Sequence, residues 1–417
     1  MLDELLDEIE VGGTRELAGV AIGIDLGTTN SIAYIIVDGS LTAIVDEEGR
    51  ELQASVVAWT PDGNRLVGDA AKARRIVDPQ NTVYSAKRLI GQPFHSKSVQ
   101  RARENVPYQI SEGNQQEILV NTRSGTQTIP QISAFVLGRL KSMAENCLQR
   151  QVTHCVVTVP ANFSDAQRSA TRQAARIAGM EVLRILNEPT AAAIAYGEGR
   201  TMQQRIAVFD LGGGTFDVSV LGVRSKLYEV IATGGDSYLG GDDVDYILFE
   251  WLAENFLQTH RIDARVDPIA TARLLVAAEE IKKGLSSEEF LEGRLNEVAV
   301  GPQGEILGLD FSISREEFES MIWPFAQKAM GVVDRVLAEA ELTASNIDEV
   351  ILVGGSTSIP LIQRLVQEKF GKTPKFHLDP MKVVALGAAV QAERLVNPSK
   401  DRSVLLDVTP HSLRIST

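Results

Sequence analysis

The chain has 417 residues, a length that favours two or more lobes over a single compact core. It is 44% hydrophobic and 23% charged, as is usual for a globular protein, and its formal net charge of −14 argues against nucleic-acid partners, which need a basic face. No apolar run approaches the roughly 18 residues that cross a membrane, and the two cysteines, Cys147 and Cys155, fit neither a zinc site nor a disulfide framework.

The chain begins with an acidic extension over residues 1–18. Its start, MLDELLDEIE, lacks the basic residues of a secretory signal, and low cysteine content suits a reducing compartment, so we expect a cytoplasmic protein. Leu2, Leu5, Leu6 and Ile9 fall on one helical face. This pattern fits a docking helix or a frayed extension, and the second is favoured.

From residue 19 to about residue 400, strand and helix patterns alternate, which predicts an α/β fold. VAIGID and SIAYIIV, at 20–25 and 31–37, predict two strands joined by a tight turn. CVVTVP, at 155–160, predicts another strand. A helix capped by Ser164 or Asp165 should follow and stop at Gly179.

The later part of the chain predicts a similar order of elements. EVLRIL, at 181–186, predicts a strand, and Pro189 lies in the first turn of the helix after it. IAVFD and FDVSV, at 206–210 and 216–220, repeat the strand–turn–strand pattern of the N-terminal part. DEVILV then predicts a strand, followed by a glycine turn and a helix ending at Gly371. The segment 284–310 predicts strands or hairpins on the rim of a second lobe.

Each of the two predicted hairpins ends its first strand in an aspartate, Asp25 or Asp210. A duplicated α/β lobe would carry such a repeat, and two facing lobes would bring both turns into one cleft. Turns rich in glycine and hydroxyl residues can direct several backbone N–H groups towards phosphate oxygens. Neither G-x-x-x-x-G-K-[ST] nor a dinucleotide fingerprint occurs, so we predict a phosphate site between the two hairpins. The turn residues are Thr28, Thr29 and Asn30 in the first hairpin and Gly212, Gly213, Gly214 and Thr215 in the second.

Four side chains are candidates for phosphoryl-transfer chemistry. Asp25 and Asp210 suit Mg²⁺, which prefers oxygen ligands and keeps much of its water. Lys87, in VYSAKRLIG, is a candidate positive charge on the phosphates, and Glu188, in ILNEPTAAA, is placed to orient an attacking water. Each of these two also has an ordinary alternative. Lys87 would be a solvated surface lysine, and Glu188 a helix-start carboxylate favoured by the helix dipole.

Eight motifs in this order resemble the ATPase domain of the DnaK-type heat-shock protein 70 chaperones. They are IGIDLGTTNS, AKRLIG, VTVPANFSDAQRSATRQAARIAG, NEPTAAAIAYG, FDLGGGTFDVSV, LGGDDVD, LVGGSTSIP and LDVTP, and the resemblance covers about residues 19–417. It implies an α/β, actin-like ATPase fold, with two lobes of duplicated α/β subdomains around a central nucleotide cleft. The implied domains are a nucleotide-binding domain at 19–401 (lobe I about 19–200 and 376–401, lobe II about 201–375), an interdomain linker at 402–408, and the start of a truncated or absent peptide-binding domain at 409–417.

The resemblance also implies ligands and residue roles. The ligands are ATP or ADP and Mg²⁺, with K⁺ as an optional further ion. Lys87 and Glu188 become the hydrolytic pair, and Asp25 and Asp210 hold the metal through water. The remaining implied residues are Asp217 in the water network, Thr215 near the γ-phosphate, Gly27 in the first hairpin, Gly240 and Gly241 on the second lobe, and Glu279, Lys282, Lys283, Ser286, Gly354, Gly355 and Ser356 around the adenosine. The four α-helical residues of this set, from Glu279 to Ser286, share one helix face, for which a solvated charged surface is the alternative.

The C-terminal segment VLLDVTP carries an apolar triplet that must either pack permanently or dock reversibly. The resemblance implies an interdomain linker, with Val404, Leu405, Leu406 and Asp407 as docking residues and Arg168 as the residue that senses them. It further implies a J-domain cochaperone and a nucleotide exchange factor as partners. Unfolded client peptides would bind only if a peptide-binding domain is present.

Three positions depart from the family pattern. Ser358 stands where the family usually has Arg near the adenine. Met381–Lys382 stands where it usually has Asp–Glu or Asp–Lys, so one acidic contact is gone, and Asn162 replaces a common Tyr. The phosphate machinery is intact, so these departures bear on nucleotide affinity and exchange more than on hydrolysis.

Three functions stay open at this point. A small-molecule kinase of the same fold would need a second substrate pocket beside the γ-phosphate, and a filament protein would use ATP to control assembly. VLLDVTP and NEPTAAA favour a chaperone ATPase in protein folding over both. Within that family, GGDSYLGGDDVD and DPMKVVALGAA point to the iron–sulfur-assembly branch, so general folding and iron–sulfur assembly both stay open.

Overall fold

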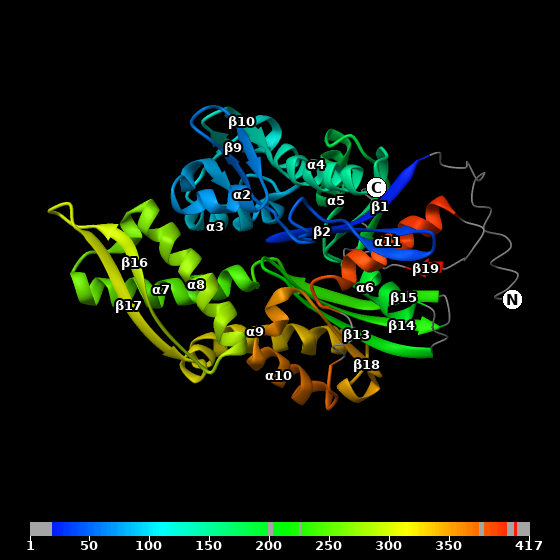
Figure 1. The fold of residues 1–417 in the computed structure, drawn as a ribbon. Helices are drawn as coiled ribbons and strands as arrows, with labels where there is room; N and C mark the ends of the chain where they lie inside the picture. The colour runs from blue at the N-terminus through cyan, green and yellow to red at the C-terminus, as the bar shows by residue number, and fades with distance from the viewer. Residues whose placement is uncertain (1–18, 199–202, 225–226, 375–378, 398–403, 407–417) are drawn as a thin grey trace, which may run out of the picture.

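The computed structural model describes residues 19–198, 203–224, 227–374, 379–397 and 404–406. Two groups of elements lie one above the other (Figure 1). We use "first lobe" for the elements built on the sheet that contains β1, and "second lobe" for those built on the sheet that contains β13. The predicted extension at 1–18, Asp407 and the segment 409–417 lie outside the described residues. The predicted lobe boundaries near 200, 375 and 401 also fall outside them and stay predictions.

The sheet of the first lobe has the strand order β12-β11-β1-β2-β3, with β4 paired to β2. Its strands are β1 (Val20–Leu26), β2 (Asn30–Val37), β3 (Ser40–Ala43), β4 (Gln53–Ala54), β11 (Val152–Val159) and β12 (Glu181–Asn187). β1 pairs antiparallel with β2 and parallel with β11. The predicted N-terminal hairpin is therefore confirmed, and its turn lies at the carboxyl end of the buried strand β1.

The outer part of the first lobe is made of short strands and helices. They are β5 (Val57–Trp59), β6 (Arg65–Val67), β7 (Thr82–Val83), β8 (Gln109–Glu112), β9 (Ile118–Thr122), β10 (Gly125–Thr128), α2 (Asp69–Lys72), the 3₁₀ helix η3 (Ala86–Leu89), α3 (Lys97–Asn105) and α4 (Ile129–Leu148). No sequence motif indicates these elements, because most of the strands are too short to show a clear period.

The helix boundaries predicted within the sequence motifs are confirmed. α5 (Asp165–Ile177) starts at Ser164, whose hydroxyl accepts from the Gln167 backbone while the Gln167 side chain accepts from the Ser164 N–H. This reciprocal capping satisfies two N–H groups that the helix start leaves free. α6 (Glu188–Gly197) has Pro189 in its first turn, as expected.

The second lobe repeats the sheet arrangement of the first. Its strand order is β18-β13-β14-β15-β19, made of β13 (Gln203–Leu211), β14 (Phe216–Arg224), β15 (Leu227–Asp236), β18 (Glu349–Val353) and β19 (Val404–Leu406). β13 pairs antiparallel with β14 and parallel with β18, just as β1 pairs with β2 and β11. The predicted repeat of the strand–turn–strand unit is confirmed.

The outer part of the second lobe contains α7 (Gly241–His260), α8 (Pro268–Ser287), β16 (Phe290–Val300), β17 (Ile306–Ser314), α9 (Arg315–Glu339) and α10 (Pro360–Phe370). The long β16–β17 hairpin projects at one end of the molecule (Figure 1). It confirms the hairpin predicted within 284–310, except that residues 284–287 still belong to α8. α10 ends at Gly371 in the left-handed conformation, as predicted.

The two sheets are joined through α6 and α11 (Val383–Val396). One core cluster contains Val156 and Ala192 of the first lobe, Val208 and Ile351 of the second, and Ala388 of α11. The helices approach very closely, because a Cβ added to Gly387 would lie 1.8 Å from the carbonyl oxygen of Ala191. This packing fixes the lobes at one side and leaves their outer parts to face each other. Among the described helices, none is both long and apolar enough to cross a membrane.

Candidate active site

A cavity of about 950 Å³ lies between the lobes and contains most of the predicted site residues. It is lined by Asp25, Gly27, Thr28, Thr29, Asn30, Lys87, Glu188, Asp210, Gly212, Gly213, Thr215, Glu279, Lys282, Lys283, Ser286, Gly354, Gly355 and Ser356. The predicted residues that stand just behind this lining are Gly214, Asp217, Gly240 and Gly241. Their positions follow from the contacts described below.

The two hairpin turns touch each other across the cavity. A Cβ on Gly213 would lie 1.8 Å from Thr29 Oγ1, and a Cβ on Gly214 would lie 2.4 Å from Thr28 Cγ2. Only glycine permits this approach without moving the opposite turn. Thr29 Oγ1 is buried and has no hydrogen-bond partner among the described residues, which leaves it free to meet a ligand.

The carboxylates at the strand ends lie in a buried and strongly negative environment. Burial, and next the nearby Glu188, raise the pKa of Asp25 from 3.8 to about 6, although Lys87 and a 3.1 Å hydrogen bond from Thr158 oppose this. Burial and the charge of Glu188 also raise the pKa of Asp210 well above its ordinary value. The ionised form of both strand-end aspartates is therefore disfavoured, because the nearby positive charge does not compensate for burial and for the other carboxylates.

Asp217 lies behind Asp210 on the neighbouring strand, directly across the β13–β14 ladder. Asp217 is 1% exposed, and neither carboxylate oxygen has a hydrogen-bond partner among the described residues. Burial, followed by the charge of Glu188, raises its pKa well above 3.8. A buried carboxylate without partners is costly, so this site is suited to a water or a cation.

Lys87 and Glu188 form an ion pair inside the cavity. Lys87 lies in η3 and Glu188 at the start of α6, and 2.7 Å separates Nζ from Oε1. Burial alone would lower the pKa of Lys87, but Glu188 and Asp25 outweigh it and raise this pKa. The lysine side chain is only 8% exposed, so the alternative of a solvated surface lysine is wrong.

The charges of this group do not balance. Four carboxylates gather here, those of Asp25, Glu188, Asp210 and Asp217. Among the described residues, Lys87 is the one cation that lowers the pKa values of the three aspartates. Carboxylate oxygens in such an excess fit a hard divalent cation, which would replace the missing positive charge. The donor set and the orphaned oxygens thus fit Mg²⁺ beside a phosphate chain.

One face of α8 borders the far end of the cavity. Glu279 is 6% exposed, accepts from Lys72 of the first lobe at 2.7 Å and pairs with Lys283 at 2.8 Å. Although burial opposes it, these lysines lower the pKa of Glu279 to about 2. Lys282 pairs with Asp245 at 2.7 Å and donates to the carbonyl of Gly241. A solvated charged face does not describe this arrangement.

The backbone of the second turn is held by its neighbours. Gly241 and Asp242 donate their N–H groups to the carbonyls of Gly212 and Gly213, at 2.9 and 2.7 Å. Ser356 Oγ donates to Gly212 at 3.0 Å. Gly354 has φ +84°, and a Cβ there would lie 2.4 Å from the Leu211 carbonyl oxygen, so this position requires glycine.

Comparison with known proteins agrees with this geometry. The family model described as "Hsp70 protein" matches residues 21–417. The chain belongs to the Hsp70 family. It is 44% identical over 398 residues, or 95% of its length, to the chaperone protein DnaK from each of two strains of Thermus thermophilus. The chain spans 64% of the length of these curated relatives. The predicted resemblance is confirmed, and the fold is the actin-like fold of Hsp70 ATPase domains.

The Hsp70-family cleft contains further polar residues that were not among the predicted site residues. Arg88 donates to the Gly214 carbonyl at 3.0 Å and pairs with Asp243 at 2.6 Å, and Ser85 donates to Asp242 at 2.7 Å. Arg88 follows Lys87 directly, and the two aspartates lie in LGGDDVD, so motif position could have indicated them. Lys72 carries no such signal, because only the fold brings it to α8.

The three departures from the family pattern have different surroundings. Ser358 and Met381 both line the cavity, and Met381 Sδ would lie 2.8 Å from a Cβ on Gly355. Lys382 pairs with Glu51 of the first lobe at 2.9 Å. Both the Asn162 amide and the Asp217 carboxylate border Gly235, lying within 2.8 Å of the position that its Cβ would take.

The predicted linker residues Val404–Leu406 form β19, which extends the second sheet as an edge strand. β19 pairs parallel with Leu227, Tyr228 and Glu229 of β15. Arg168 donates to Asn187 at 2.7 Å and to the carbonyl of Phe163 at 3.1 Å, which ties the loop before α5 to the residue preceding Glu188. Its role in sensing the linker stays a prediction.

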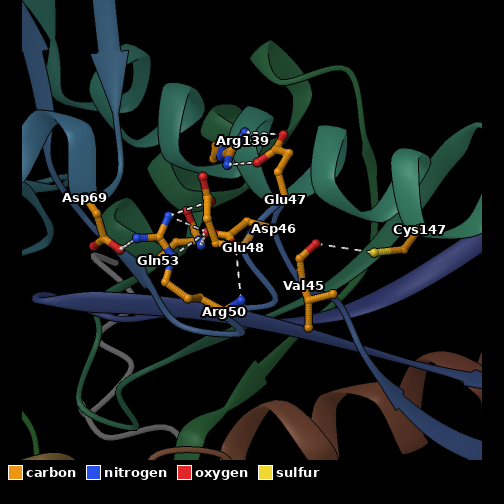
Figure 2. A network of polar contacts seen from close by, with 9 residues as sticks. All are labelled: Val45, Asp46, Glu47, Glu48, Arg50, Gln53, Asp69, Arg139 and Cys147. Carbon is orange, nitrogen blue, oxygen red and sulfur yellow. Dashed lines mark hydrogen bonds and ion pairs between the residues drawn. The ribbon is translucent and has the colours of Figure 1, made fainter.

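Another group of carboxylates, Asp46, Glu47 and Glu48, lies together outside the cleft (Figure 2). Asp46 accepts from Arg50 at 2.8 Å and from Gln53 at 2.9 Å, and these bonds hold its pKa below 3.8 although burial alone would raise it. Arg139 pairs with Glu47 at 2.7 Å. The charges are met by neighbouring side chains, so this group stabilises the connection between β3 and β4.

Proposed function

We propose that this chain binds ATP with Mg²⁺ in the cleft and hydrolyses it to ADP and phosphate, as the nucleotide-driven part of a chaperone. The observation that carries the proposal is the buried group of carboxylates beside the Lys87–Glu188 pair, placed where the two glycine turns touch. Phosphoryl transfer to water needs positioned charges and an oriented nucleophile, and this arrangement supplies both.

Asp25 and Asp210 would hold the metal through water molecules. Both are buried at strand ends, and their raised pKa values reflect an environment that favours added positive charge. Bound Mg²⁺ would supply charge neutralisation on the phosphates. Asp217, with both oxygens unpaired among the described residues, would hold a water or K⁺ behind it.

The turns and the ion pair would place the reacting groups. Thr28, Thr29 and Asn30 on one side, and Gly212 to Thr215 on the other, would direct backbone N–H and hydroxyl groups to the phosphate oxygens. The ammonium of Lys87 would contact the transferring phosphate. Glu188, fixed by Lys87 at 2.7 Å, would orient the attacking water.

The adenosine would lie between α8 and the Gly354–Ser358 segment. The residues proposed for it are Glu279, Lys282, Lys283, Ser286, Gly354, Gly355 and Ser356, all of which line the cavity. Ser358 and Met381 would border the same pocket, so base affinity depends on them as well.

The chaperone role is supported by the relatives, whose name is "Chaperone protein DnaK". We propose a cytoplasmic role in protein folding and the stress response, with a J-domain cochaperone and a nucleotide exchange factor as partners. Client peptides would require a peptide-binding domain. The paired strand β19 supports a linker that docks on β15 in one nucleotide state.

The test is phosphate release from ATP with no acceptor present, followed by addition of a J-domain cochaperone. We expect basal release that needs Mg²⁺ and rises with the cochaperone. Phosphorylation of a sugar would favour the kinase alternative, and ATP-dependent sedimentation would favour a filament. Arg139→Gln, which removes an ion pair on the outer face of the first lobe, is the control variant and should behave like the wild type.

A further inference from the structure

Tyr238 connects the two lobes at the side of the phosphate turns. It belongs to the second lobe, between the end of β15 and the start of α7. Its hydroxyl donates at 2.5 Å to the backbone carbonyl of Ser98 in α3, which belongs to the first lobe. The Tyr238 side chain, which lines the cavity, thus bridges the two lobes.

The ring of Tyr238 meets two cations of the first lobe. The guanidinium carbon of Arg88 lies 5.2 Å from the ring centroid, and that of Arg101 lies 5.4 Å from it. Both distances are within the range of a cation–π interaction. Three residues of one lobe therefore hold one tyrosine of the other.

One of these cations is attached to the second phosphate turn. Arg88 donates to the carbonyl of Gly214 at 3.0 Å and to Asp243 at 2.6 Å. Asp243 in turn accepts from the N–H of Gly240 at 2.9 Å. Any separation of the lobes that frees Tyr238 must also disturb the contacts that fix this turn.

We propose that Tyr238 is a positioning residue that holds the cleft closed and sets the rate at which nucleotide leaves. This inference rests on the proposed function, because it presumes a nucleotide between the turns. Release requires the turns to move apart, and that motion breaks the hydroxyl bond and both ring contacts. Tyr238 makes no hydrogen bond to the Lys87–Glu188 pair, so hydrolysis of bound ATP within the closed cleft should not depend on it.

The experiment compares Tyr238→Phe, Tyr238→Ala and the wild type by stopped-flow release of fluorescent ADP. Loss of one net hydrogen bond should speed release about two- to tenfold in Tyr238→Phe, and Tyr238→Ala should release faster still. Single-turnover hydrolysis should stay at the wild-type rate in both. A purely structural defect would instead lower the melting temperature and slow the hydrolysis step.

Tyr108→Phe is the matched control. The Tyr108 hydroxyl also donates to a backbone carbonyl, that of Tyr84 at 2.7 Å, but both residues belong to the first lobe. Its ADP release should equal that of the wild type. Arg101→Gln, at a side chain that is 54% exposed and also pairs with Asp243 of the second lobe at 3.8 Å, should speed release in the wild type. It should have a smaller effect in Tyr238→Ala, where its ring contact is already absent and only the Asp243 pair is left to lose.

The outcomes separate the two proposals. If the wild type binds no ADP, the proposed function fails and this inference fails with it. If the wild type binds ADP and Tyr238→Phe and Tyr238→Ala both release it at the wild-type rate, the role of Tyr238 alone is overturned. Faster release in Tyr108→Phe by the same factor would also overturn it, since the effect would then not depend on crossing the cleft.

Discussion

Lys87 and Glu188 form a buried ion pair with 2.7 Å between Nζ and Oε1, although 101 residues separate them in the chain. Each contributes to the pKa of the strand-end carboxylates, Glu188 by raising and Lys87 by lowering the pKa values of Asp25 and Asp210. The pair is therefore the electrostatic centre of the cleft. Its removal gives the most direct test of the chemistry.

Lys87→Ala should abolish ATP turnover while leaving nucleotide binding largely intact, because the ammonium would act on the transferring phosphate. It also leaves Glu188 buried and unpaired, which should lower the free energy of unfolding by about 3–5 kcal/mol. Calorimetric titration with ADP and phosphate release measure the two effects. Equal loss of binding and turnover would place the lysine in the ground-state site instead.

Asp25→Asn should stabilise the chain without nucleotide or Mg²⁺. The pKa of Asp25 is raised from 3.8 to about 6, so the folded state holds this proton to a higher pH than the unfolded chain does. The free energy of unfolding therefore falls as the pH rises between these two values. Asparagine cannot ionise, so at pH values above the folded-state pKa the variant should gain up to about 3 kcal/mol. Thermal melts at acidic and neutral pH measure this, and a gain that is the same at both would contradict it.

The same Asp25→Asn variant should lose the stabilisation that Mg²⁺ with ADP is expected to give the wild type, because one of the two carboxylates proposed to hold the metal through water is gone. Melting curves with and without the metal test this in one series. If Mg²⁺ still stabilised the variant, Asp25 would not be one of the residues that hold the metal.

Lys72→Gln should speed ADP release several-fold. Lys72 joins the first lobe to Glu279 of α8 at 2.7 Å. Without it Glu279 keeps Lys283 of its own helix at 2.8 Å and only the longer 3.6 Å contact with Arg75 of the first lobe. The difference in ADP release rate between Lys72→Gln and the wild type should shrink at high salt, because part of this ion pair is solvent-accessible and is screened by salt. Arg139→Gln, whose partner Glu47 belongs to the same lobe, is the control (Figure 2). A salt-independent difference would argue against a cross-cleft ion pair.

Gly213→Ala should weaken nucleotide binding strongly, because its Cβ would lie 1.8 Å from Thr29 Oγ1 and push the two turns apart. Gly331→Ala is the matched control, since a Cβ there would meet nothing within 4 Å and the residue lies inside α9. That control should gain about 0.5–1 kcal/mol of stability. Nucleotide titration of both variants checks the prediction, and equal affinities would show that the turns need not touch.

Deleting Val404–Leu406 should change basal ATP turnover. These residues pair in parallel with β15. The last residue of β15, Asp236, pairs with Phe216 directly after the Gly212–Thr215 turn and lies two residues before Tyr238. Leu405→Pro should act in the same direction, since proline removes a backbone donor and is poorly tolerated in a paired strand. Steady-state phosphate release measures both variants. Unchanged turnover would leave the pairing of β19 without a role in coupling.

The sequence by itself determined the local units and their repetition. Strand–Asp–turn–strand patterns indicated the two hairpins, Ser164 and Gly371 marked helix ends, and eight ordered motifs indicated the Hsp70 family. These features depend on hydrophobic periodicity, capping side chains and glycine conformations, all of which act between residues close in the chain. The candidate carboxylates of the cleft could be named for the same reason.

Tertiary structure alone decided which side chains meet across the cleft. The burial of Lys87, the contact of Lys72 with Glu279 and the position of Tyr238 on Ser98 have no local signal, because each joins segments more than a hundred residues apart. Close packing of α6 and α11 brings the two sheets together, and the long-range contacts follow from that geometry. Periodicity describes each element's buried face, but the identity of its distant partner is set only when the elements pack.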